Sequence, residues 1–154
     1  MDMVFIFGAK YLFLFSILGV LWYFWVSTQE TRKKLVVFLI LSLPLTYLVG
    51  VGARALYFNP RPFVVENFEP LVSHTADNGF PSDHLLLLGA LSAAMLFFDR
   101  RISSWLWGIA VFVAVSRVYV GIHHFLDVGA SIAIALLCAI LVKTLWKHKN
   151  QTNF

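Results

Sequence analysis

Long runs of apolar residues, separated by short clusters of charge, fill most of this sequence of 154 residues. The hydrocarbon core of a bilayer is about 30 Å thick, so a spanning helix needs about 20 mostly apolar residues. The chain is 60% hydrophobic and 13% charged, whereas roughly a quarter of the residues in a soluble domain are charged. The pattern predicts an all-α bundle of about five transmembrane helices, over residues 4–26, 35–53, 82–98, 102–122 and 125–146.

Composition also excludes several classes of protein. The chain is too apolar to be disordered, and its one cysteine, Cys138, rules out a secreted disulfide scaffold. The net charge of +4 does not indicate a nucleic-acid partner, because the basic residues lie in short clusters between apolar runs. The first run has neither a basic leader nor a small-residue cleavage site, so we expect it to be retained. We expect one membrane-embedded domain over residues 1–154.

The basic residues predict the topology, because lysine and arginine gather on the cytoplasmic side of membrane proteins. With the N-terminus outside and the C-terminus inside, eight of the twelve basic residues lie on the inner side: Arg32, Lys33, Lys34, Arg100, Arg101, Lys143, Lys147 and Lys149. The unusual polar residues then lie together at the outer ends of four spans: Arg54, Ser82, Asp83, His84, Arg117, His123 and Asp127.

This placement predicts one polar site at the outer membrane surface. An ionisable residue costs about 2.5–3.5 kcal/mol at the centre of a spanning helix, less near its ends, and is functional by default. For Lys10 alone we expect simple snorkelling to the interface. Snorkelling does not explain mixed charges and paired histidines at one depth.

His123 and Asp127 are four residues apart, so on a helix they share one face. Asp127 can then accept a hydrogen bond from one ring nitrogen of His123 and leave the other directed at a substrate, which is the arrangement of an oriented nucleophile or base. His124 points about 100° away and lacks this partner. A metal ligand pair and a simple polar pair at a helix start remain open at this spacing.

Pro81 and Ser82 are typical of a helix start, and the free N–H groups there form an anion site. Ser82 can donate its hydroxyl to a phosphate oxygen, and His84 lies in the first turn. Because the charge of Asp83 would repel an anion, we expect its side chain to point away and to support the helix N-terminus.

Three arginines complete the set: Arg54, Arg61 and Arg117. The planar guanidinium group suits fork-like contacts with phosphate. Three such groups and a helix start, opposite two histidines and an aspartate, predict a phosphoryl-transfer site.

The order and spacing of these residues resemble the type 2 phosphatidic acid phosphatase superfamily, whose signature is Lys-x6-Arg-Pro, Pro-Ser-Gly-His and Ser-Arg-x5-His-x3-Asp. The match covers residues 54–127, with Arg54 in place of the lysine and Asp83 in place of the glycine. The Pro-Ser-Asp-His variant resembles the bacterial, bacitracin-resistance type of undecaprenyl-diphosphate phosphatase. The three segments here read Arg54-x6-Arg61-Pro62, Pro81-Ser82-Asp83-His84, and Ser116-Arg117-x5-His123-x3-Asp127.

The resemblance implies a hydrolase that converts undecaprenyl diphosphate to undecaprenyl phosphate and so recycles the carrier lipid of peptidoglycan synthesis. His123 would be the nucleophile, Asp127 its orienting partner and His84 the general acid and base. Phosphate would bind to Arg54, Arg61, Ser82 and Arg117. The family works without a metal or other cofactor, its partners are a polyprenyl diphosphate and membrane lipids, and the protein would lie in a bacterial cytoplasmic membrane with its site facing outward.

Three alternatives stay open. A phosphatase of the same class could act on phosphatidylglycerophosphate or phosphatidate. A non-catalytic protein that binds or transports anionic lipids would need the arginines but not the alignment of His123 with Asp127. A metallophosphatase would need most of these acceptors to converge on cations: His74, Asp77, His84, His123 and Asp127. For the loop residues Glu66, Glu69, His74 and Asp77 we expect solvated side chains.

Overall fold

The computed structural model describes the backbone of residues 1–151 and the side chains of residues 1–147. This part of the chain is helical, with one isolated β-bridge between Pro60 and Asn78, so the predicted all-α class is confirmed. The helices are α1 (Asp2–Tyr11), α2 (Phe13–Val26), α3 (Gln29–Leu56), α4 (Pro62–Val65), α5 (Asp83–Met95), α6 (Arg100–Tyr119) and α7 (Phe125–Gln151).

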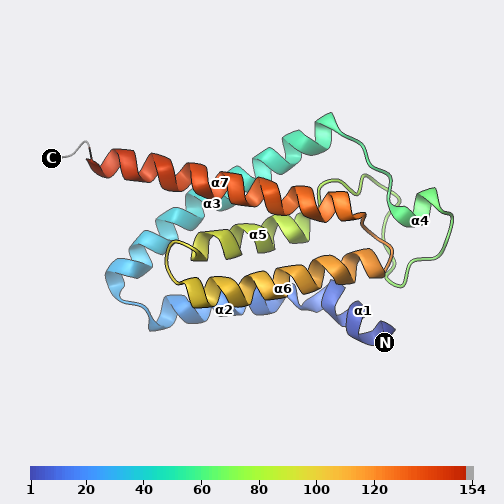
Figure 1. Ribbon diagram of the computed structural model, residues 1–154, viewed down its shortest axis with the longest axis horizontal. Coiled ribbons are helices and arrows are strands. Elements are labelled where there is room, and N and C mark those ends of the chain that lie inside the picture. The colour runs from blue at the N-terminus through green and yellow to red at the C-terminus, as the bar shows by residue number, and fades with distance from the viewer. Residues whose placement is uncertain (152–154) are drawn as a thin grey trace.

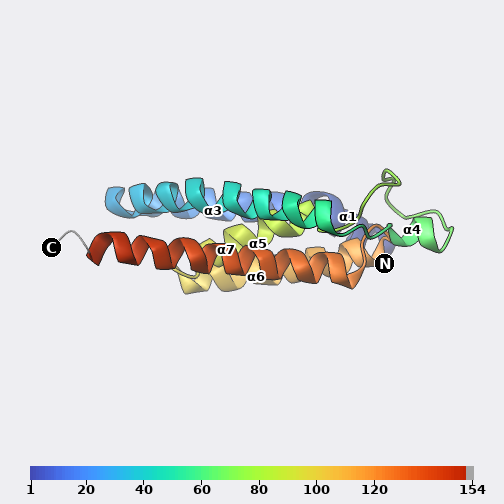
Figure 2. The same cartoon turned by 90° about the horizontal axis from the view of Figure 1, so that it is seen from above.

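Helix α5 forms the centre of the bundle, and α2, α3, α6 and α7 all pack against it (Figures 1 and 2). Ten of its 13 residues are buried. Gly89 allows α7 to come close, because a Cβ atom there would lie 2.8 Å from the Cβ of Ala135. A helix that is apolar on all sides is expected in such a central position.

Three helices are long and apolar enough to cross a membrane: α3, α6 and α7. Helices α1 and α2 add a fourth span if the pair, bent by 49° at Leu12, is taken as one. Helix α5 rises only about 20 Å at 1.5 Å per residue, less than the bilayer core of about 30 Å. The run predicted as a third span over 82–98 is therefore a shorter central helix, and the structure has three to four candidate spans.

The basic clusters lie at one end of the bundle, at the turns from α2 to α3 and from α5 to α6 and along the last turns of α7 (Figure 1). Arg32 stabilises the turn from α2 to α3, because its Nε donates to the carbonyl of Phe24 at 2.8 Å. Asp99 caps α6 by accepting from the backbone N–H groups of Arg101 and Ile102. The N-terminus and the long connection from α3 to α5 lie at the other end.

Helix α1 packs tightly on α6 at the end of the bundle away from the basic clusters. A Cβ atom on Gly8 would lie 2.4 Å from the Oγ atom of Ser116, so the contact depends on glycine. The neighbouring Ala9 lies in the last turn of α1, where carbonyl groups begin to lack helical partners. Its carbonyl accepts a hydrogen bond from Nη1 of Arg117 at 3.0 Å.

Candidate active site

A polar cavity of about 170 Å³ lies at the end of the bundle away from the basic clusters. The predicted convergence of four helix ends is present, because its walls come from the end of α3, the start of α5, the end of α6, the residues before α7 and the long connection. Its lining residues are Arg54, Arg61, His74, Asp77, Asn78, Pro81, Asp83, His84, Arg117 and His123. Two other predicted site residues, Ser82 and Asp127, are fully buried and lie outside this lining.

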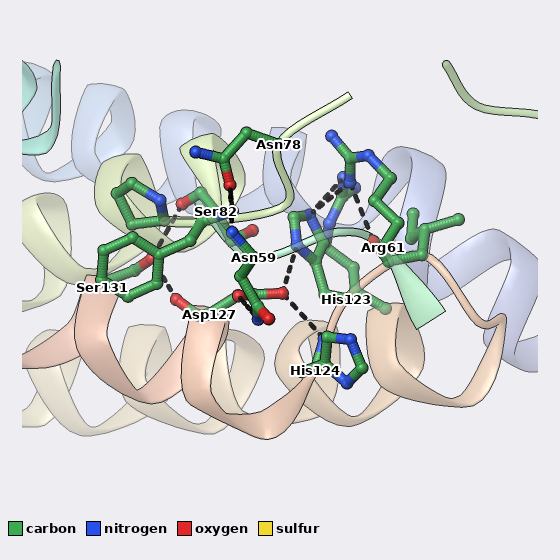
Figure 3. A network of polar contacts seen from close by, with 12 residues as sticks. Asn59, Arg61, Asn78, Ser82, His123, His124, Asp127 and Ser131 are labelled. Carbon is green, nitrogen blue, oxygen red and sulfur yellow. Dashed lines mark hydrogen bonds and ion pairs between the residues drawn. The ribbon is translucent and has the colours of Figure 1, made fainter. Parts of the chain in front are cut away.

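Asp127 contacts and orients the imidazole ring of His123 (Figure 3). Its Nδ1 lies 3.3 Å from Oδ2 of Asp127. His123 precedes the first residue of α7, so the pair does not sit on one regular helical face, but the spacing of four still brings the two side chains together. With Nδ1 facing the carboxylate, Nε2 is the ring nitrogen left for the cavity.

Two guanidinium groups lie next to that nitrogen. Nη2 of Arg117 is 3.3 Å from Nε2 of His123, and Nη1 of Arg61 is 3.5 Å from it. Burial lowers the pKa of His123 to about 4; the hydrogen bond that His123 donates to Asp127 opposes this shift, and the charges of Arg117 and Arg61 add to it. Since a lowered pKa favours the uncharged ring, Nε2 carries a lone pair at neutral pH.

The ring of His124 has a different environment. Its Nε2 lies 3.0 Å from the carbonyl oxygen of Pro60, and its backbone N–H donates to Oδ2 of Asp127 at 2.8 Å. His124 is absent from the cavity lining. Of the two adjacent histidines, only His123 lines the cavity.

Sequence reasoning missed Asn59, which holds the other oxygen of the carboxylate. Its Nδ2 donates to Oδ1 of Asp127 at 2.7 Å. Asn78 in turn fixes Asn59, because its Oδ1 accepts from the backbone N–H groups of Asn59 and Phe80. Figure 3 shows the resulting chain of contacts from the connection to the carboxylate. Asparagine before proline reads as an ordinary turn residue, so no sequence signal distinguished Asn59.

Ser82 is the N-cap residue of α5, as predicted, but its side chain caps no N–H group. Its Oγ is buried and has no hydrogen-bond partner among the described residues. The backbone of Ser82 is fixed instead, because Oγ of Ser131 donates to the carbonyls of both Ser82 and Asp127. Nε of Arg117 is also buried without a partner in the described part of the chain. Buried polar atoms of this kind call for an explanation; Arg117 also lines the cavity, whereas Ser82 does not.

The connection contributes more to the cavity than the sequence analysis expected. Asp77 is not a merely solvated loop residue, because its Oδ1 accepts from Nε of Arg61 at 2.7 Å. Burial alone would raise the pKa of Asp77, but hydrogen bonds from Arg61 and Thr75 outweigh it and the pKa is lowered. Arg61 also donates to the carbonyl of Ile122. Glu66 and Glu69 are exposed and lie outside the cavity lining, whereas His74 lines it.

Asp83 does not point away from the cavity, and that expectation is wrong. Its Oδ1 lies 2.6 Å from Nη2 of Arg54, and both side chains line the cavity. The physical reason is the position of Arg54: the last turn of α3 brings its guanidinium next to the carboxylate of Asp83, and the two groups form an ion pair.

His84 also lines the cavity. Its ring packs edge-on against Phe13, with centroids 4.9 Å apart. Neither ring nitrogen has a hydrogen-bond partner among the described residues, so both remain available for proton transfer. Within the same residues no group of three or more histidine, cysteine, aspartate or glutamate side chains could hold a metal ion.

Fold and site together define a membrane phosphatase family. Residues 35–151 match the PAP2 superfamily, and the chain belongs to that superfamily. The chain is 30% identical over 138 residues to the bacitracin transport permease protein BcrC of Bacillus licheniformis, and the match covers 88% of this chain and 67% of the relative. It is 38% identical over 105 residues to undecaprenyl-diphosphatase BcrC of Bacillus subtilis (strain 168), covering 66% of this chain and 51% of the relative.

The chain thus spans about half to two thirds of the length of these curated relatives. Among solved structures, LpxE of Aquifex aeolicus has the same fold, with a TM-score of 0.73. The two chains are 21% identical, and the match covers 93% of this chain and 85% of that one.

Proposed function

We propose that this chain is a single catalytic domain that hydrolyses a polyprenyl diphosphate to the polyprenyl monophosphate and inorganic phosphate. The observation that supports this most directly is the buried His123, oriented by Asp127 and flanked at Nε2 by Arg61 and Arg117. A protein that only bound anionic lipids would need the arginines but no oriented imidazole. The name of the Bacillus subtilis relative, an undecaprenyl-diphosphatase, supports the choice of lipid.

In the first step, Nε2 of His123 attacks the terminal phosphorus. The bond from that phosphorus to the bridging oxygen breaks, and the lipid monophosphate leaves with its electron pair. Asp127 stabilises the positive charge that develops on the ring, as the aspartate of a Ser-His-Asp triad does for its histidine. His84 supplies a proton to the leaving oxygen where the leaving group needs one.

In the second step, His84 takes a proton from water, and the water oxygen attacks the phosphohistidine. The P–N bond breaks, inorganic phosphate leaves, and His123 is restored. Arg54, Arg61, Arg117 and the hydroxyl of Ser82 bind the phosphate oxygens of the substrate, and Arg61 and Arg117, which lie next to Nε2 of His123, stabilise the charge of both transition states.

We propose further that the site faces the outer side of a bacterial cytoplasmic membrane. The basic clusters lie at the opposite end of the bundle from the cavity, and basic residues gather on the cytoplasmic side. The N-terminus is then outside and the C-terminus inside. An outward site suits the recycling of a carrier lipid whose diphosphate form is released there during peptidoglycan synthesis.

Phosphate release from three lipids tests the assignment. Purified protein in detergent is expected to hydrolyse a polyprenyl diphosphate at least about tenfold faster, by kcat/KM, than phosphatidate or phosphatidylglycerophosphate. The reason is that a lipid monophosphate is a far better leaving group than an alkoxide. Faster turnover of phosphatidylglycerophosphate would instead assign the chain to monoester hydrolysis, and no turnover of any of the three would favour the lipid-binding alternative.

Treatment with EDTA is expected to change the rate of phosphate release by less than about twofold relative to the untreated protein. The reason is that guanidinium groups can supply the positive field that a metal ion gives in other phosphatases. A cation at Nε2 of His123 would be repelled by the two arginines beside it. The measurement is the rate before and after chelation, followed by addition of Mg²⁺ or Zn²⁺. Loss of activity on chelation, with recovery on adding a metal ion, would contradict the histidine nucleophile and support the metallophosphatase.

A further inference from the structure

The two positions at which this chain departs from the signature of its superfamily contact each other. Arg54 stands in the lysine position and Asp83 in the glycine position, and the two side chains form an ion pair at 2.6 Å. Two backbone carbonyls hold the same guanidinium: Nε donates to Phe80 and Nη2 to Pro81. Nη1 has no hydrogen-bond partner among the described residues. The guanidinium is therefore fixed through Nε and Nη2, and Nη1 remains free to donate.

This ion pair lies where two cavities meet. Asp83 lines the polar cavity and also an apolar groove of about 430 Å³ between α3 and α5. The other residues of the groove are almost all apolar: Leu43, Pro44, Thr46, Tyr47, Leu86, Leu87 and Ala90. The change from charged to apolar lining thus occurs at Asp83, beside Arg54.

A lipid diphosphate has to cross the same change of environment. Its terminal phosphate reacts at Nε2 of His123, next to Arg61 and Arg117. Its isoprenoid tail does not fit among the charged walls of a 170 Å³ cavity, and the groove offers an apolar surface that begins at Asp83. The phosphate attached to the lipid therefore comes between these two places, within reach of Arg54.

We propose that Arg54 binds the lipid-side phosphate of a diphosphate and that Asp83 is the positioning residue that orients its guanidinium. The pair would then select diphosphates over phosphate monoesters, which have no second phosphate. A lysine carries its charge on a flexible stem, whereas an arginine held by a carboxylate presents its remaining donor atom, Nη1, in a fixed direction. This inference rests on the proposed function and adds a basis for its substrate preference.

The test compares farnesyl diphosphate with farnesyl monophosphate, which share one tail. In Asp83→Asn the kcat/KM for the diphosphate is expected to fall about tenfold, mainly through a higher KM. The kcat/KM for the monophosphate is expected to change less than about threefold. Arg54→Lys should lower the diphosphate preference as well, and the double variant Arg54→Lys/Asp83→Asn should lose no more preference than the stronger single variant, because the two residues act as one unit.

Glu30→Gln is the matched control, since it removes another exposed ion pair of 2.6 Å, between Glu30 and Lys34, at the far end of the bundle. It should leave the preference unchanged. Exposed ion pairs add little to folding stability, so the Asp83 variant is expected to fold. Faster hydrolysis of both substrates by Asp83→Asn would mean that Asp83 only repels anions. An equal loss of kcat/KM on both substrates would mean that the variant disturbs the site in general. Either result overturns the inference. Failure of the unmodified protein to hydrolyse farnesyl diphosphate would instead reject the proposed function.

Discussion

Replacement of His123 by alanine is expected to lower the rate of phosphate release by at least about 10⁴-fold, because removal of a covalent nucleophile leaves only binding and electrostatic stabilisation. The side chain is 2% exposed and is anchored at Nδ1 by Asp127. The phosphoenzyme trapped by rapid denaturation of the unmodified protein should be acid-labile and stable in alkali, as a phosphohistidine is. It should be absent from the variant.

His124→Ala is the matched control for this experiment. It removes the neighbouring imidazole, which contacts the carbonyl of Pro60 rather than the cavity. We expect the rate of phosphate release by this variant to fall less than about tenfold, because the connection between α6 and α7 becomes less well ordered. Retention of activity in His123→Ala together with loss in His124→Ala would place the nucleophile one residue along the chain and contradict the assignment of the motif.

Replacement of His84 by glutamine is expected to slow steady-state hydrolysis of a polyprenyl diphosphate by about 10²- to 10⁴-fold, the usual contribution of a general acid or base. The loss should fall on the second step, since attack of water on the phosphohistidine needs a base whereas a lipid monophosphate leaves with little assistance. The phosphoenzyme should then accumulate. Rapid-quench measurement should show a burst of lipid monophosphate with an amplitude near the enzyme concentration, followed by slow turnover.

A lipid phosphate monoester provides the contrast for the same variant. Its leaving group is an alkoxide, so the first step also needs the proton from His84, and no burst is expected. Hydrolysis of the monoester should fall more severely than that of the diphosphate. Equal losses on the two substrates, without a burst on either, would show that His84 does not transfer protons and acts only by packing against Phe13.

The sequence was enough to predict that four helix ends meet at one polar site. Hydropathy sets the approximate limits of the helices, and the alternation of spans then places Arg54, His84, Arg117 and His123 at the same end of the bundle. The spacing of four between His123 and Asp127 predicts their contact even though His123 lies just before α7. Periodicity and topology are sufficient for such features because they depend only on the backbone.

Other features depend on how side chains and loops settle in three dimensions. The contact of Asn59 with Asp127 follows from the path of the connection between α3 and α5, which hydropathy does not define. The direction of Asp83 depends on the position of Arg54, 29 residues earlier in the chain. Hydropathy does not show that α5 is short, because the apolar residues continue to Phe98 although the helix ends at Met95.

The contact between Arg117 and the carbonyl of Ala9 has a practical consequence for the labelling of this protein. A backbone oxygen of the first helix fixes a guanidinium that lies beside the reacting nitrogen. Because Gly8 also leaves no room for even a methyl group against Ser116, small displacements of α1 are transmitted directly to this guanidinium. A fluorescent reporter or affinity tag attached at the start of α1 would disturb this contact, whereas one attached at the end of α7 would lie at the other end of the molecule (Figure 1).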